Sequence, residues 1–238
     1  MTQRKCKRIL LKISGESFCQ PGGFGIDDSQ CISIAEKIRD VAMLGTEVAV
    51  VNGAGNILRG EAFSKNGTIS RYTADYMGML ATIMNACALQ ETLEKIGQPA
   101  RVLSAIEVAA ICDEFTRRKA IKHLERKEVA ILAGGTGNPF FTTDTCAALR
   151  ASELGVDLLI KATKVDGVFD KDPMKYPDAK FYDHINYDDV LKNNLRIMDH
   201  PAISLCKENN IPIIVLNIFK NDNIIKAIKG EKVGTLIS

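Results

Sequence analysis

The chain has 238 residues, 46% of them hydrophobic, which is enough for a substantial core in a single domain spanning residues 1–238. The formal net charge is +2 with 25% charged residues of mixed sign, so we expect neither nucleic acid nor a membrane as the main partner. Seven scattered cysteines without a CxxC pair, and no credible targeting segment, predict a cytoplasmic protein with reduced thiols. The three histidines lack metal-ligand spacing, so a structural metal site is not expected.

Apolar runs alternate with helical patterns along the chain. We expect a strand over 8–13, a helix that begins near Asp27 and is closed by Gly45, a strand over 46–51, and a long helix over about 73–96. Further strands are expected at 100–103, 129–133, 157–162 and 213–216, each with helical sequence nearby. The alternation predicts an α/β fold, a three-layer αβα sandwich with a mostly parallel central sheet.

Two stretches predict exceptions to parallel pairing. Residues 164–169 contain the turn signal Asp166-Gly167, which favours a hairpin. Residues 233–237 are expected to form an edge strand.

A glycine-rich loop, Gly134 to Asp144, lies between the strand at 129–133 and a helical segment at 145–154. A helix start offers unpaired N–H groups and the positive end of a dipole, and glycines allow close backbone approach to an anion. Thr143 or Asp144 could instead serve only as a helix cap. A cap requires neither three glycines nor the insert Pro139-Phe140-Phe141, so the loop predicts an anion site.

Other candidate ligand groups follow the remaining strands, at the sheet edge where α/β proteins bind ligands. Neither GxxxxGK[ST] nor GxGxxG is present, so a phosphate site must combine short glycine loops with fixed cations. Lys12 and Lys161 end apolar strands, where burial is costly unless an anion is reached. Arg59 follows the loop Gly53 to Asn56, and Asp75 lies near a helix start, where capping is the alternative.

Over essentially its full length the chain resembles the bacterial uridylate (UMP) kinase family of the amino acid kinase superfamily. Residues 137–144 together with Asp75-Tyr76-Met77-Gly78 carry the most specific part of the resemblance. It implies transfer of the γ-phosphoryl group of ATP to UMP, with Mg²⁺ carried by ATP and no metal site of the protein's own. Further matching segments are 12–16, 53–56, 59–60, 74–79, 136–137, 161–168, 172–173 and 198–199.

Pattern and resemblance together assign three groups of site residues. The catalytic group is Lys12, Arg59, Asp144, Lys161 and Asp199. The ATP-binding group is Lys12, Ile13, Ser14, Gly15, Gly55, Arg59, Thr163, Phe169 and Asp172. The UMP-binding group is Ala54, Asp75, Thr136, Gly137, Asn138, Pro139, Phe140, Phe141, Thr142 and Thr143.

Two positions depart from the family pattern. Ala54 replaces a glycine in the UMP phosphate loop, which predicts a negative φ there so that its amide can still donate. Glu128 stands where some relatives carry an arginine linked to activation by GTP, although Arg101 is retained at a second such place. Activation by GTP is therefore in doubt, while a homohexamer and inhibition by UTP are implied by the resemblance alone.

Two other functions use the same scaffold. A non-catalytic nucleotide-binding storage or sensor protein would be expected to lose Lys12 or the loop 136–144. A kinase for a carboxylate or carbamate would share the lysine and glycine loops, but it has no use for residues 138–144 and Asp75.

Overall fold

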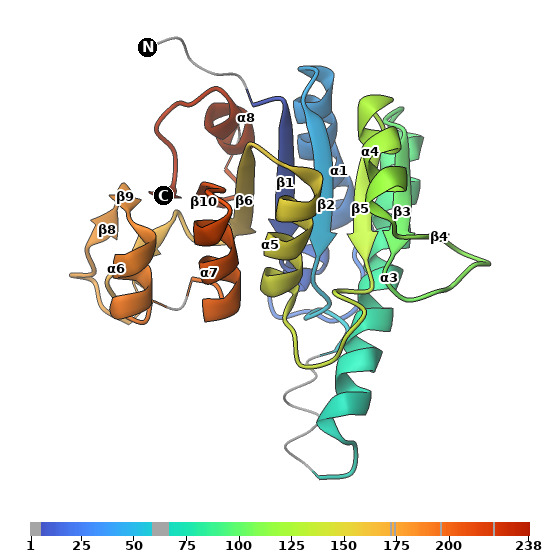
Figure 1. Ribbon diagram of the computed structural model, residues 1–238, viewed down its shortest axis with the longest axis horizontal. Helices are drawn as coiled ribbons and strands as arrows, with labels where there is room; N and C mark the ends of the chain where they lie inside the picture. The colour runs from blue at the N-terminus through green and yellow to red at the C-terminus, as the bar shows by residue number, and fades with distance from the viewer. Residues whose placement is uncertain (1–5, 59–66, 172, 174, 196, 221) are drawn as a thin grey trace.

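The computed structural model describes residues 6–58, 67–171, 173, 175–195, 197–220 and 222–238. Within these ranges a nine-stranded sheet has the order β4-β3-β5-β2-β1-β6-β10-β11-β9, and β7 pairs with β8 separately (Figure 1). The strands are β1 (Arg8–Ile13), β2 (Glu47–Asn52), β3 (Ala100–Ser104), β4 (Asp113–Glu114), β5 (Val129–Ala133), β6 (Leu158–Thr163), β7 (Val168–Phe169), β8 (Phe181–Tyr182), β9 (His184–Ile185), β10 (Ile213–Asn217) and β11 (Thr235–Ile237). The helices are α1 (Asp28–Met43), α3 (Arg71–Lys95), α4 (Arg117–Glu125), α5 (Thr143–Leu154), α6 (Tyr187–Lys192), α7 (His200–Glu208) and α8 (Asn223–Ile228), with a 3₁₀ helix η1 (Gly15–Phe18).

Strand alternation divides the core into two layers. In β1, Ile9, Leu11 and Ile13 pack toward α1, α3 and α8, whereas Leu10 packs toward α4, α5 and α7. All neighbouring strands of the described nine-stranded sheet are parallel except β10 and β11. The predicted three-layer α/β fold is therefore confirmed.

Side-chain caps set the starts of two helices that border the site. The Ser70 hydroxyl accepts from the Thr73 amide, so α3 begins earlier than predicted and Asp75 is not its cap. The Thr142 hydroxyl accepts from the amides of Asp144 and Thr145 at 3.1 Å each, so the cap of α5 is neither Thr143 nor Asp144.

The predicted hairpin at 164–169 is wrong. Strand β6 lies between two parallel partners, β1 and β10, and β7 pairs instead with β8. The local reason is that the Thr163 hydroxyl accepts from the Val165 amide, while the Val168 amide donates to the Thr235 hydroxyl. The chain after β6 is therefore directed away from its own strand.

The expected edge strand at 233–237 is also corrected. Strand β11 pairs with β10 on one side and with β9 on the other, so β9 forms the edge of the described sheet. The sequence pattern of β11 gave no sign of β9, which contributes only two residues.

The carboxyl ends of β1, β2, β5 and β6 lie at one edge of the sheet, and α3 extends beyond that edge in Figure 1. The loops that follow β1, β2 and β5 therefore meet beside α3 and the start of α5. Among the described residues, no helix is long and apolar enough to cross a membrane.

Candidate active site

Two lysines stand side by side at this edge. Lys12 of β1 and Lys161 of β6 are register partners on adjacent parallel strands. Because side chains alternate, Lys12 shares the face of Leu10 and Lys161 the face of Leu159, which is the face that α5 covers. Both lysine side chains are largely buried, at 10% and 15% exposure. Two neighbouring buried ammonium groups require a counter-charge.

Asp144, in the first turn of α5, supplies that charge. Its Oδ1 lies 2.7 Å from Lys12 Nζ, and its Oδ2 accepts from Lys161 Nζ at 2.7 Å. Burial opposes ionisation of Asp144, but the charges of Lys12 and Lys161 outweigh it and hold its pKa below the usual value. Burial lowers the pKa of Lys161, although Asp144 counteracts the shift. These three residues, the lysine–aspartate triad, carry a net charge of about +1 when all are ionised.

The segment before α7 joins this triad. Lys161 Nζ donates to the Ile197 carbonyl, and Asp199 Oδ2 accepts from the hydroxyls of Thr142, at 2.8 Å, and Thr145. Asp199 Oδ1 is buried without a hydrogen-bond partner among the described residues. Asp199 is therefore bound to the start of α5, and the same segment reaches Lys161 through the Ile197 carbonyl. Thr145 was not predicted, although its spacing of three from Thr142 on a helix was a usable signal.

The loops after β1 and β2 are in direct backbone contact. The Gly53 amide donates to the Ile13 carbonyl at 2.8 Å, and a Cβ on Gly15 would lie 2.3 Å from Gly55 N. Only glycine fits at position 15 for this reason. The Ile13 side chain is fully buried in the core, and Ser14 precedes η1 without a side-chain capping bond.

The φ angle of Ala54 is not positive, as predicted. Its methyl group is buried, at 8% exposure, and its carbonyl accepts from the amides of Ile57 and Leu58 at 2.9 Å. The replacement of a glycine therefore introduces no backbone strain in this loop.

A cavity of about 150 Å³, the α3 pocket, lies between α3 and the loops after β2 and β5. Its α3 residues recur at helical spacing, so one face of the helix forms a wall. Six lining residues were not in the predicted UMP-binding group: Leu58, Ala74, Gly78, Met79, Thr82 and Gly135. The remaining predicted residues Thr136, Gly137, Pro139 and Phe140 belong to the same loop without lining the cavity. The lining residues are Ala54, Leu58, Ala74, Asp75, Gly78, Met79, Thr82, Gly135, Asn138, Phe141, Thr142 and Thr143.

The glycine loop needs its glycines for conformation. Gly134, Gly135 and Gly137 have φ values of +74°, +58° and +79°, which L side chains rarely adopt. Phe140 also has a positive φ, +70°, and its amide donates to Asp75 Oδ2 at 2.7 Å. The Arg71 guanidinium donates to Asp75 Oδ1 at 2.7 Å. Asp75 therefore ties the loop to α3.

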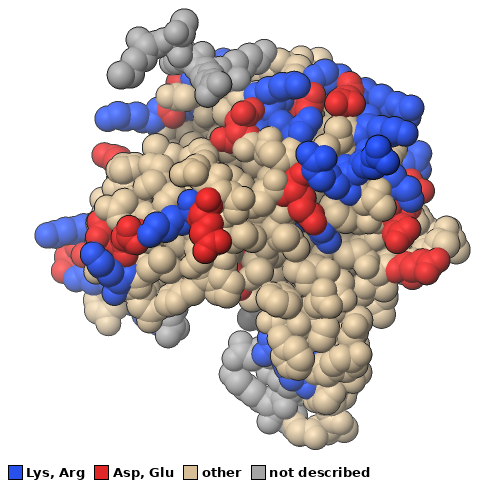
Figure 2. All heavy atoms as spheres, viewed as in Figure 1, with Lys and Arg blue, Asp and Glu red and all other residues tan. Residues whose placement is uncertain are grey.

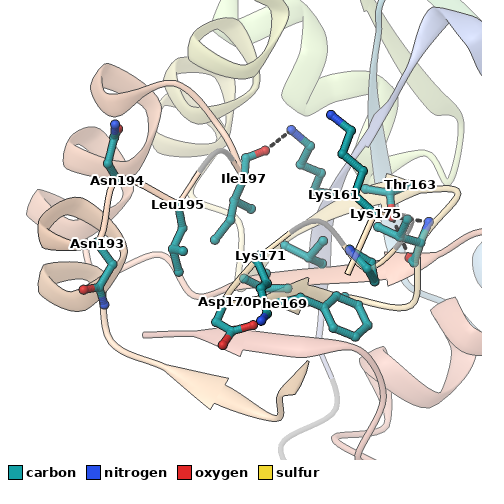
Figure 3. Close-up of a pocket in the computed structure, with 15 residues that line it drawn as sticks. Lys161, Thr163, Phe169, Asp170, Lys171, Lys175, Asn193, Asn194, Leu195 and Ile197 are labelled. Carbon is teal, nitrogen blue, oxygen red and sulfur yellow. Dashed lines mark hydrogen bonds between the residues drawn. The ribbon is translucent and has the colours of Figure 1, made fainter. Parts of the chain in front are cut away.

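A larger cavity, the β7 pocket of about 650 Å³, has Lys161 of the triad in its wall (Figure 3). The α3 pocket is lined instead by Thr143, which precedes Asp144 of the triad. Lys161 lines it and donates to Ile197, while Phe169 lies on another wall, edge-on to Phe181 with 5.3 Å between ring centroids. The predicted Thr163 and Phe169 line this pocket, but Arg59 and Asp172 lie outside the described residues. The wall formed by Asn193, Asn194 and Leu195 had no local sequence signal that pointed to it.

Two other reactive possibilities find no support in the geometry. The described residues contain no group of three or more His, Cys, Asp or Glu side chains that could hold a metal ion. Cys146 is fully buried, and burial raises its pKa to about 11, so packing rather than nucleophilic chemistry accounts for it.

Basic side chains on the face shown in Figure 2 are concentrated on α4, which contains no residue of the triad. Figure 2 shows Lys and Arg side chains concentrated over α4, at the upper right of that face. This helix carries Arg117, Arg118, Lys119 and Lys122. The buried triad is therefore not an extension of a surface basic patch.

Glycine loops and cations at the carboxyl edge of a parallel sheet define an α/β protein that binds phosphorylated ligands. The chain belongs to the amino acid kinase family, whose model matches residues 7–217.

Solved structures agree with this family. UMP kinase from Bacillus anthracis is 36% identical with a TM-score of 0.95, covering 99% of this chain and 97% of its own. UMP kinase from Ureaplasma parvum is 39% identical with a TM-score of 0.91, covering 99% of both chains. Uridylate kinase from Archaeoglobus fulgidus is 26% identical with a TM-score of 0.72, covering 97% of this chain and 99% of its own.

Proposed function

We propose that this chain transfers the γ-phosphoryl group of ATP to UMP, giving ADP and UDP. The observation that carries the proposal is the position of the lysine–aspartate triad between two cavities of different size. Likeness to UMP kinases at 36% and 39% identity over nearly the whole chain supports the choice of acceptor.

The α3 pocket is the proposed UMP site. In this proposal the loop that contains Ala54 would contact the acceptor phosphate, and Asn138, Phe141, Thr142 and Thr143 would surround the nucleoside. Asp75 already holds the glycine loop through the Phe140 amide, so it would shape this pocket as well as contact ribose. Backbone donors held by a fixed scaffold give such a pocket its selectivity.

The β7 pocket is the proposed ATP site. Its volume of about 650 Å³ suits a nucleotide, and Phe169 offers an apolar ring to the base. From there the triphosphate would extend past Lys161 toward Lys12 and the Ser14-Gly15 turn. Lys161 borders the β7 pocket and shares Asp144 with Lys12, so in this proposal the two ammonium groups would lie between donor and acceptor.

In the proposed reaction an oxygen of the UMP phosphate attacks the γ-phosphorus, and the bond from that phosphorus to the bridging β-oxygen breaks. The electron pair remains on ADP. Positioning and charge stabilisation dominate this chemistry, so a protein base is not required. Lys12 and Lys161 would neutralise developing charge, while Asp144 keeps the two ammonium groups in place before substrate arrives.

Mg²⁺ fits this arrangement as a companion of ATP. Asp199 Oδ1 is buried and has no hydrogen-bond partner in the part of the chain that the structure describes, so it would offer one carboxylate ligand. Mg²⁺ is typically bound by one or two carboxylates together with substrate phosphates. Both oxygens of Asp144 face lysines, which makes Asp199 the better candidate. When bound, the ion would reduce the negative charge of the triphosphate.

The alternatives are less well supported. A storage or sensor protein has no need for two lysines held between two cavities. A carboxylate or carbamate kinase leaves the loop 136–144 and its bond to Asp75 without a role.

The deciding experiment is a coupled assay of ADP release with ATP and Mg²⁺ against UMP, CMP, AMP and acetylglutamate. We expect a strong preference for UMP. Preference for another acceptor, or no turnover with any, would overturn the proposal. Addition of GTP tests activation by this nucleotide. Glu128 is unfavourable for binding GTP because its carboxylate and that of Glu94 line the same cavity as Arg101. Addition of UTP tests feedback inhibition.

Assembly as a homohexamer also remains a proposal. Tyr72, Leu80 and Met84 of α3 are 54%, 48% and 56% exposed, and exposed apolar side chains at helical spacing favour burial against another subunit. Light scattering coupled to size exclusion would measure the mass directly, and a monomer would contradict the proposal.

A further inference from the structure

A buried hydrogen-bond network lies beneath the α3 pocket. Its side chains are Asn52, Asn56, Thr82 and Asn85, which are exposed by 1%, 2%, 2% and 0%. Burial of polar side chains is unfavourable unless their hydrogen bonds are made, and apolar residues would pack α3 on the sheet equally well. The partners of these four residues therefore indicate why they are polar.

Asn85 and Asn56 form a reciprocal amide pair. Asn85 Nδ2 donates to Asn56 Oδ1 at 2.8 Å, and Asn56 Nδ2 donates to Asn85 Oδ1 at 2.9 Å. Asn85 Nδ2 also donates to the Gly53 carbonyl at 2.9 Å, and Asn56 Nδ2 to the Gly25 carbonyl at 2.7 Å. Asn85 thus holds both ends of the loop Gly53 to Asn56.

Thr82, one turn earlier on α3, holds the second loop. Its hydroxyl accepts from the Gly134 amide at 2.9 Å and donates to the Met79 carbonyl at 2.6 Å. The Thr82 carbonyl in turn accepts from Asn52 Nδ2 at 2.8 Å, at the end of β2. One turn of α3 therefore contacts the loop after β2 and the loop after β5.

We propose that Asn85 and Thr82 are positioning residues that fix the acceptor phosphate loop relative to the glycine loop. This inference rests on the proposed function, in which both loops bind UMP. The Gly53 amide is bonded to β1 through the Ile13 carbonyl, whereas the Gly53 carbonyl and the Gly134 amide are both bonded to side chains of α3. These bonds from α3 connect the two loops and set their separation. A shift of these loops would weaken acceptor binding while leaving the β7 pocket unchanged.

The test compares Asn85→Ala and Thr82→Val with a matched control, Gln98→Ala. Gln98 is also buried, and its Nε2 donates to the carbonyls of Pro99 and Lys127 at 3.0 and 3.1 Å, away from both loops. Steady-state kinetics would give KM for UMP and for ATP and kcat, and hydrogen exchange would report on the amides of 53–56 and 134–137.

Asn85→Ala is expected to raise KM for UMP about tenfold while KM for ATP changes by less than about twofold, as loss of buried hydrogen bonds predicts. Thr82→Val should raise KM for UMP about fivefold, with recovery of most of that loss in Thr82→Ser. Gln98→Ala should lower the melting temperature without altering either KM. Amide hydrogen exchange of residues 53–56 and 134–137 should be faster in Asn85→Ala than in the unmodified chain, and unchanged in Gln98→Ala.

Equal changes in both KM values, or loop exchange no faster than in the control, would overturn the positioning role. If Asn85→Ala does not fold, the Thr82→Val and Thr82→Ser pair decides alone. If the unmodified chain lacks activity on UMP, the proposed function fails, and hydrogen exchange still decides whether α3 holds the two loops.

Discussion

The α3 pocket and the β7 pocket are built in different ways. The α3 pocket, of about 150 Å³, is enclosed by α3 and by the loops after β2 and β5, which α3 holds through buried side-chain hydrogen bonds. The β7 pocket, of about 650 Å³, is lined by β6, β10 and the two-residue strand β7, and by Lys171, which pairs with the exposed Asp178. Under the proposed function, acceptor selectivity would therefore depend on fixed backbone, and donor binding on solvent-screened side chains.

Substitution of Asp144, which binds the lysines beside both pockets, should give the largest effect on stability. Asp144→Asn leaves two adjacent buried ammonium groups without their counter-charge, which should lower the free energy of unfolding by about 3 to 5 kcal/mol. Urea unfolding measures the loss. The control Asp178→Asn removes an exposed pair and should cost less than about 1 kcal/mol. Equal losses in the two variants would contradict a special role for the buried junction.

The same variant predicts a pH dependence. Because the folded pKa of Asp144 is lowered, its ionised form stabilises the fold above the unfolded pKa of about 3.9, and that contribution is lost as pH falls through the folded value. The stability difference between the unmodified chain and Asp144→Asn should therefore narrow below about pH 4. A difference that stays constant down to pH 2.5 would show that the triad does not lower this pKa.

Lys12→Ala should raise the activation free energy by about 3 kcal/mol, which lowers kcat roughly 150-fold, because a preorganised charge at the transferring group is lost. Single-turnover kinetics separate this loss from weaker nucleotide binding. Near-normal turnover would remove Lys12 from the catalytic group and leave it only as a partner of Asp144.

Asp75→Asn addresses the α3 pocket alone. In the wild type both carboxylate oxygens of Asp75 accept hydrogen bonds, one from the Phe140 amide and one from Arg71. The substitution replaces one oxygen with an NH₂ group, which cannot accept, so KM for UMP should rise about tenfold. KM for ATP should stay constant. An effect confined to ATP would place Asp75 at the other nucleotide.

Phe169→Ala addresses the β7 pocket and should give the smallest effect. Loss of the ring face should raise KM for ATP about threefold to fivefold, in line with the modest energy of a partly exposed aromatic contact. Phe169→Tyr keeps the ring and serves as the control. A larger effect on UMP than on ATP would contradict the assignment of the two pockets.

The layers of the fold could be predicted from sequence because each central strand is a continuous apolar run. Strands β7, β8 and β9 could not, since two-residue strands have no periodicity and depend on partners distant in the chain. The hairpin predicted from Asp166-Gly167 does not form because β6 is paired on both sides, with β1 and with β10, and this tertiary pairing overrides the local turn preference.

Within the candidate site, residues with a charge or a special conformation were predictable. Lys12 and Lys161 end apolar strands, and Gly134, Gly135 and Gly137 adopt conformations that favour glycine. Asn85 and the Ile197 carbonyl were not predictable: Asn85 lies mid-helix among apolar residues, and a backbone acceptor has no side-chain signal. Their roles depend on which segments the fold brings together.

The register of Lys12 with Lys161 has an implication for how such a site can change. The spacing of the two ammonium groups is set by backbone pairing of β1 and β6, whereas the walls of both pockets come from loops and helices. Loops can be lengthened, shortened or replaced without moving the charged pair, but a one-residue slip of β6 would turn Lys161 to the opposite face. A scaffold of this kind can acquire new acceptors through its loops while it retains the same means of handling phosphate.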